Sequence, residues 1–178
     1  MGKVSDLIWN VTHPFKVKHP WWDAVWTIQH IRNGKVIWEQ ARRNALVDEG
    51  ERNVLLSYFR DENAPSTFYL RLAYDTLLET DTLANVANEP SGNGYVAQEL
   101  TRDALGWPTI ELDAGDYRLT SKEVDFDAVG GNIGPVNVMY LATTSDNTGL
   151  LVAFVPLALE RTILAGDTLR AQIRPKLK

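Results

Sequence analysis

Alternation of apolar and polar positions along the chain predicts a fold built mostly from β-strands. Residues 24–31 alternate imperfectly but are rich in β-branched side chains, and residues 35–42 return with a similar composition. Between the two runs stands Asn33–Gly34, a dipeptide that tolerates the positive φ angles of a tight turn. The sequence therefore predicts a β-hairpin over residues 24–42.

Helical spacing of apolar positions is clearest in residues 48–60. We expect Asp48 to cap the helix, and the acidic residues of the first turn suit the positive end of its dipole. Gly50 weakens this turn slightly, and Pro65 lies just beyond the end. One face of the predicted helix carries four apolar residues, namely Val54, Leu55, Tyr58 and Phe59.

Short strands punctuated by turn residues follow the helix, together with one long loop over residues 75–94. We expect a short helical turn near residues 82–86 of this loop. The predicted strands are 66–74, 95–102, 108–112, 117–127, 135–143, 149–156 and 167–176. This spacing is typical of a β-sandwich or jelly roll. We therefore expect a mainly β protein with one short helix and a single domain over residues 23–178.

Residues 1–22 differ from the rest in being basic, aromatic and interrupted by Pro14 and Pro20. Proline blocks regular helix and central strand, so this segment is expected to form an extended N-terminal arm. The arm either binds a neighbouring subunit or packs on its own domain, and both interpretations stay open. The candidate partner-binding residues are Trp9, Phe15, Lys16, Lys18, Trp21 and Trp22.

Composition and charge narrow the classes of function. The chain has 178 residues and a net charge of −5, which argues against wholesale nucleic-acid binding. Cysteine is absent, so disulfides, zinc–thiolate sites and thiol nucleophiles are excluded. No apolar run is long enough to span a membrane, and the N-terminus lacks the apolar core of a secretory signal.

Candidate chemistry is sparse. The histidines are His13, His19 and His30, without the converging ligands that zinc needs. Acidic groups occur at Asp75, Glu79 and Asp81, at Asp113 and Asp116, and at Asp125 and Asp127. They could serve calcium binding or glycoside hydrolysis, but loop acids more often form turns and solvated faces. We expect no enzyme activity, no metal and no cofactor.

Several segments resemble a group of virion proteins of tailed bacteriophages. Residues 44–50 (NALVDEG) resemble the group's N-x-L-V-x-x-G segment, and residues 65–72 (PSTFYLRL) resemble its first long strand. Residues 89–95 (EPSGNGY) are similar to its E-x-S-G-x-G-Y turn. Residues 149–157 and 161–169, the latter ending in a G-D-T-L turn, resemble its closing strands. The resemblance spans residues 36–178 and rests on the order and spacing of these motifs.

This resemblance implies a non-catalytic virion protein with a β-sandwich-like body. The leading hypothesis is a capsid decoration (cement) protein made in the host cytoplasm. It would bind the major capsid protein on the outer shell, associate with itself as a homotrimer, and bind no nucleic acid or membrane. The first alternative is a tail, neck or fibre-associated protein. The second is a carbohydrate-binding module that uses loops 75–94 and 128–134, with Tyr74 and Tyr95 at the edges of the longer loop.

Overall fold

Two antiparallel β-sheets, stacked face to face, form the body of the protein. The computed structural model describes residues 22–177. The mainly β prediction is confirmed, with 51% of the described residues in strands, 10% in helix, and a sandwich-like arrangement. The elements are β1 (Trp22–Arg32), β2 (Lys35–Arg43), β3 (Ala45–Leu46), α1 (Asp48–Phe59), β4 (Thr67–Ala73), the 3-10 turn η2 (Leu83–Asn85), β5 (Gln98–Thr101), β6 (Thr109–Asp113), β7 (Asp116–Thr120), β8 (Val124–Asp127), β9 (Ile133–Ala142), β10 (Leu151–Ile163) and β11 (Thr168–Leu177).

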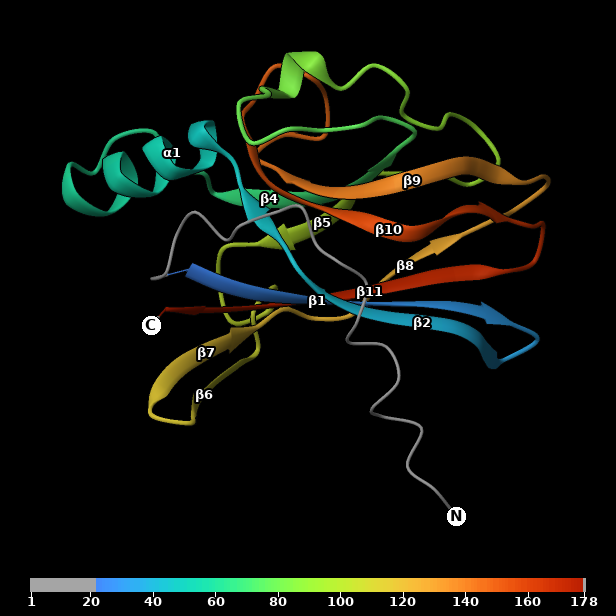
Figure 1. Cartoon of the computed structure of the whole chain (residues 1–178), viewed down its shortest axis with the longest axis horizontal. Coiled ribbons are helices and arrows are strands. Elements are labelled where there is room, and N and C mark those ends of the chain that lie inside the picture. Colours follow the sequence, from blue (N-terminus) through green and yellow to red (C-terminus); the bar gives the residue numbers. More distant parts are fainter. Residues whose placement is uncertain (1–21, 178) are drawn as a thin grey trace.

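The two sheets differ in strand number and order. Sheet A has the order β2-β1-β11-β7-β6, and β8 also pairs with β11. Sheet B has the order β3-β10-β9-β4-β5, and α1 lies at one end of it (Figure 1). The predicted hairpin is confirmed: β1 and β2 pair antiparallel around Asn33 and Gly34, with φ angles of 50° and 71°.

The main core fills the space between the inner faces of the sheets. Strand β1 buries alternate residues, among them Trp26 and Ile28, as the period of two requires. These side chains belong to one cluster with Leu70 of β4, Met139 of β9 and Ile173 of β11. Burial of large apolar side chains from both sheets is the main force that holds the sandwich together.

A second core lies on the outer face of sheet B. Three loop residues, Leu77, Leu83 and Val86, pack there in one cluster with Tyr140 and Phe154 of the sheet. The helical turn expected near residues 82–86 is present as η2. The long loop is therefore a third layer of the body on this side, not a free surface segment.

The predicted strand over residues 117–127 is divided in the structure. Strands β7 and β8 both pair with β11, and they are separated by the irregular residues 121–123. The Ser121 backbone N–H donates to Ile173 at 2.9 Å, and its hydroxyl accepts from the Ile173 N–H at 2.9 Å. A buried serine thus replaces a regular strand pair, which alternation alone does not reveal.

The start of α1 also differs from the expectation. The helix spans Asp48–Phe59, one residue less than the predicted 48–60. Val47 occupies the N-cap position, and no side chain caps the helix. Asp48 is instead the first helical residue, because Val47 is buried in the second core. Glu49 anchors this turn by accepting hydrogen bonds from the backbone N–H groups of Leu83 and Leu151, at 3.3 and 2.6 Å.

Within residues 22–177, no helix combines the length and apolarity that a membrane span requires.

Candidate functional site

The acidic side chains considered for calcium or glycoside chemistry are engaged by protein donors. Asp125 accepts two hydrogen bonds from Arg170, at 2.7 and 2.8 Å. Asp113 accepts from Lys176 at 3.1 Å, and this hydrogen bond lowers its pKa. Asp75 accepts from two backbone N–H groups of its own loop, at 3.1 and 3.0 Å. These carboxylates stabilise turns and strand pairs of the body.

Among residues 22–177, no three histidine or acidic side chains are grouped so that they could hold a metal ion. His13 and His19 lie outside the described residues. His30 is buried on the inner face of β1, where its Nε2 lies 2.8 Å from Oδ2 of Asp167. Arg32 donates to both oxygens of the same carboxylate, at 2.7 to 3.1 Å.

The His30–Asp167 pair is arranged like two members of a catalytic triad, but it lacks a visible nucleophile. The other ring nitrogen of His30, Nδ1, is buried and has no hydrogen-bond partner within the described part of the chain. A triad would place a hydroxyl there. We therefore interpret the pair as a structural link between β1 and the turn before β11.

Acid is expected to weaken the fold through Asp167. Hydrogen bonds from Arg32, and to a smaller extent from His30, lower the pKa of Asp167 to about 2 from an ordinary value of 3.8. A carboxyl with a lowered folded pKa stabilises the protein above its unfolded pKa, and this contribution disappears as the pH falls from about 4 to about 2.

Urea unfolding between pH 2 and pH 5 measures this contribution. The Asp167→Asn variant should show a flatter dependence of the urea midpoint on pH than the unchanged protein. The exposed Asp61→Asn change is the control and should leave the slope as it is. Equal slopes in all three proteins would contradict the assignment.

A buried arginine forms the second polar cluster, on the outer face of sheet B. Arg71 of β4 is 2% exposed and forms a two-pronged ion pair with Glu89 of the long loop, through Nε at 2.9 Å and through Nη2. Its remaining donors reach the backbone carbonyl of Asp146 at 2.7 Å and Oδ1 of Asn147 at 3.0 Å. The guanidinium carbon lies 5.2 Å from the ring centre of Tyr140. Arg71 therefore joins the sheet to two loops.

Tyr95 completes this cluster. Its hydroxyl donates to Oε1 of Glu89 at 2.5 Å and accepts the N–H of Leu72 at 3.0 Å. Burial, reinforced by Glu89, raises the pKa of this hydroxyl. The Tyr95 ring stacks on Phe126 at 5.9 Å. Tyr95 is thus directed into the body, whereas Tyr74, the other aromatic residue considered for sugar binding, is 44% exposed.

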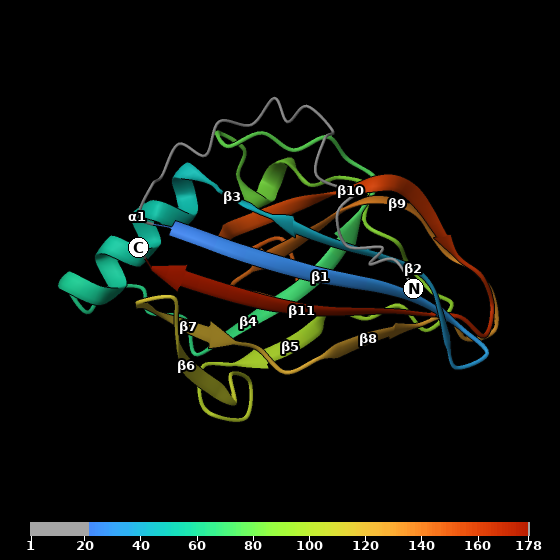
Figure 2. The same ribbon diagram turned by 60° about the horizontal axis from the view of Figure 1, so that its bottom comes forward.

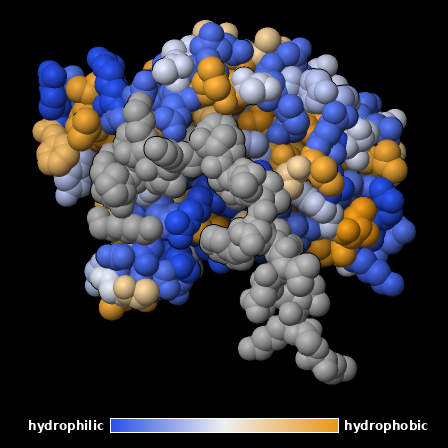
Figure 3. All heavy atoms as spheres, viewed as in Figure 1, coloured by the Kyte–Doolittle hydropathy of each residue, from blue (hydrophilic) through white to orange (hydrophobic). Residues whose placement is uncertain are grey.

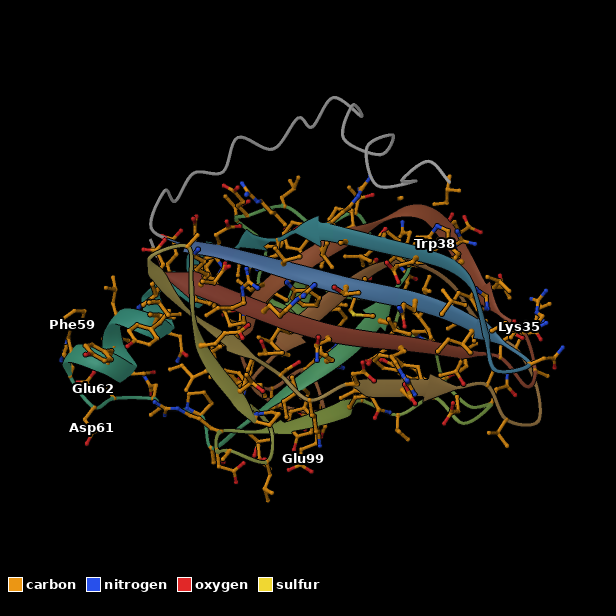
Figure 4. All side chains as sticks on the ribbon, turned by 90° about the horizontal axis from the view of Figure 1, so that it is seen from below. Lys35, Trp38, Phe59, Asp61, Glu62 and Glu99 are labelled. Carbon is orange, nitrogen blue, oxygen red and sulfur yellow. The ribbon has the colours of Figure 1, made fainter. Side chains whose placement is uncertain are left out.

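The apolar face of α1 points outward. Leu55, Tyr58 and Phe59 are 52, 80 and 74% exposed, and we call these three residues the outer helix face. The residues that the helix buries against the body are Gly50 and Asn53. The rings of Tyr58 and Phe59 pack edge to face with centres 5.0 Å apart. Figure 4 shows Phe59 at one extreme of the molecule, near Asp61 and Glu62, and Figure 3 shows apolar atoms at this tip.

A second apolar surface lies at the same end of the molecule, on sheet A. The register pairs Leu112 with Tyr117, Ile110 with Leu119, and Leu177 with Trp22. Lys176 and Arg118 are also paired, and they point away from the core. Because side chains alternate along each strand, the neighbouring Leu177 and Tyr117, and the residues paired with them, lie on the inner face of sheet A. We call the four exposed members the apolar shelf: Ile110 (69% exposed), Leu112 (65%), Tyr117 (66%) and Leu177 (60%). Figure 2 shows β6, β7 and the end of β11 near α1.

Of the candidate partner-binding residues, Trp22 lies within the described part of the chain. Trp22 is the first residue of β1, packs partly buried against the main core, and donates from Nε1 to Oδ1 of Asn44 at 3.2 Å. Trp9, Phe15, Lys16, Lys18 and Trp21 lie outside the described residues. The sequence analysis did not single out Arg71 or Glu89 as a polar cluster. For Arg71 there is a signal, because it is the lone arginine in the apolar run of residues 66–74.

Comparison of the sequence with models of known protein families finds no match, and comparison with curated proteins finds none either.

Proposed function

We propose that this protein is a non-catalytic structural protein of a tailed-phage virion, and specifically a capsid decoration protein that binds the outer shell. The observation that carries the proposal is the outward apolar face of α1. A helix on a globular body normally turns its apolar stripe toward the core. Here three of the four apolar residues of that face are exposed and Val54 is half-buried, while the residues that the helix buries are a glycine and an asparagine.

The outer helix face has the composition of a protein-binding hot spot. Aromatic side chains supply large contact area at little entropic cost and are enriched at the centres of interfaces. The contact between Tyr58 and Phe59 holds the two rings together before any partner binds. Charged neighbours, Arg60 and Glu62, form an ion pair beside them and provide a polar rim.

The rest of the described body supports a binding role over a chemical one. Its carboxylate pairs are taken up by arginine, lysine and backbone donors, and the His30–Asp167 pair is buried. The resemblance to phage virion proteins implies the major capsid protein as the partner, and self-association as a homotrimer is part of the same proposal. Repeated binding on a symmetric shell multiplies modest individual contacts.

Loss of the outer helix face is expected to abolish attachment to particles without unfolding the protein. The test compares the double change Tyr58→Ser and Phe59→Ser with the unchanged protein in a binding assay on purified capsids. Each aromatic truncation at a hot spot costs about 2 kcal/mol or more, so the double variant should bind roughly a thousandfold more weakly.

The control is Ile37→Ser, which removes another half-exposed apolar side chain from the edge strand β2. This variant should bind normally, and the melting temperature should be close to unchanged in both. Full binding by the double variant would contradict the role of α1.

Copy number in purified particles decides where the protein sits. A ratio near one chain per major capsid protein supports the shell. A ratio of a few per cent or less supports the alternative tail, neck or fibre position. Absence from the particle would overturn both structural roles.

A further inference from the structure

The apolar shelf lacks a covering layer among residues 22–177. Its four side chains lie on the face of sheet A that is buried under sheet B elsewhere in the sandwich. The opposite face of the same hairpin is polar, where Arg118 and Lys176 share the carboxylate of Asp113. A hairpin with one polar and one uncovered apolar face is expected to be covered by another segment in the working protein.

The chain itself supplies a segment at this place. Trp22 stands opposite Leu177 in the register, so residues 1–21 join the body at the edge of the shelf. Strand β6 lies three strand positions from β1 in sheet A, about 15 Å at roughly 4.8 Å per strand. About five extended residues span that distance, so Phe15, which lies seven residues before Trp22, is within reach of the hairpin.

The chemistry of this segment suits the shelf and the body around it. Residues 1–21 carry Trp9, Phe15 and Trp21, together with aliphatic residues. The segment has a net charge of +2, from Lys3, Lys16 and Lys18 against Asp6. The whole chain has a net charge of −5, so residues 22–178 carry −7. Apolar side chains and opposite net charge therefore both favour binding of the segment to the body.

We infer that residues 1–21 pack on the apolar shelf of their own subunit, with Phe15 contacting Leu112 and Tyr117. Attachment at Trp22 gives the segment an effective concentration in the millimolar range at the shelf, which a separate copy does not have. The lysines of the segment are then free to face a partner. The inference is independent of the virion role and of the outer helix face.

Photo-crosslinking tests the inference in the full-length chain. A photoreactive amino acid replaces Phe15, and equal amounts of isotopically light and heavy protein are mixed before irradiation. The expected result is crosslinks to residues 110–119 and 175–177, joining light to light and heavy to heavy only. Mixed light–heavy crosslinks would assign the segment to a second copy and overturn the inference, as would crosslinks confined to other surfaces or no crosslinks at all.

Trypsin cleavage after Lys16 and Lys18 gives a second measurement. The double change Leu112→Ser and Tyr117→Ser should release the segment and raise the cleavage rate about tenfold, since cleavage follows the population of the open form. The matched control, Phe59→Ser on α1, should leave the rate unchanged. Equal rates in the two variants would overturn the inference, while particle binding by the shelf variant reports separately on the proposed function.

Discussion

Replacement of Glu89 by alanine is expected to lower the free energy of unfolding by about 3–5 kcal/mol, the range for breaking a buried ion pair. Arg71 is 2% exposed, and both prongs of its guanidinium contact Glu89. Alanine leaves this cation without a counter-ion in a site closed by Tyr140 and Tyr95. The loss is large because the desolvated charge remains in place after its partner is removed.

Urea denaturation monitored by tryptophan fluorescence gives the measurement. The double change Glu89→Ala and Arg71→Met should be less destabilising than Glu89→Ala alone, because methionine at position 71 leaves no buried charge without a partner. The control is Glu62→Ala in the exposed Arg60–Glu62 pair, which should cost less than about 1 kcal/mol. Equal losses at Glu89 and Glu62 would show that the Arg71 cluster is solvated.

Exchange of Gly50 for alanine is the second large effect, and its sign is opposite to that expected from helix propensity. Alanine in a helix interior is ordinarily about 1 kcal/mol more favourable than glycine. At position 50, however, an added Cβ would lie 2.1 Å from the carbonyl oxygen of Val152 in β10. Because that atom belongs to a buried backbone strand, the helix must move away from the sheet, and we expect a loss of about 2–3 kcal/mol.

Thermal and urea unfolding of Gly50→Ala check this sign. The control is Arg52→Ala, a change at an exposed residue of the same helix. It should alter the free energy of unfolding by less than about 0.5 kcal/mol. A stabilised Gly50→Ala protein would mean that α1 does not sit tightly on β10. Since this contact fixes the orientation of α1, the variant should also bind particles less well if the outer helix face is the binding surface.

Local signals predicted most of the strands because they depend on neighbouring residues only. Asn33–Gly34 specifies its turn, and alternation locates strands such as β4 and β11 to within one or two residues. The period of a helix shows which side chains share a face, but not which way that face turns in the fold. The orientation of α1 is set by the close approach of Gly50 to Val152, which are about a hundred positions apart.

The polar clusters illustrate the same limit. Arg71 lies on the outer face of its strand, a position that normally faces water, and it is buried because the long loop folds over it. Nothing local to residues 66–74 indicates that loop. Ser121 similarly interrupts a run that reads as one strand, since its hydrogen bonds are made to Ile173, which lies 52 positions away.

The two ends of the sandwich are suited to different uses in engineering. The beginning of β1, the end of β11 and α1 lie at one pole, and the Asn33–Gly34 turn lies at the other (Figure 1). Foreign peptides fused to the C-terminus would crowd the apolar shelf and the outer helix face. Peptides inserted between Asn33 and Gly34 would project from the far pole, so this exposed turn is the natural place to carry a displayed antigen or label.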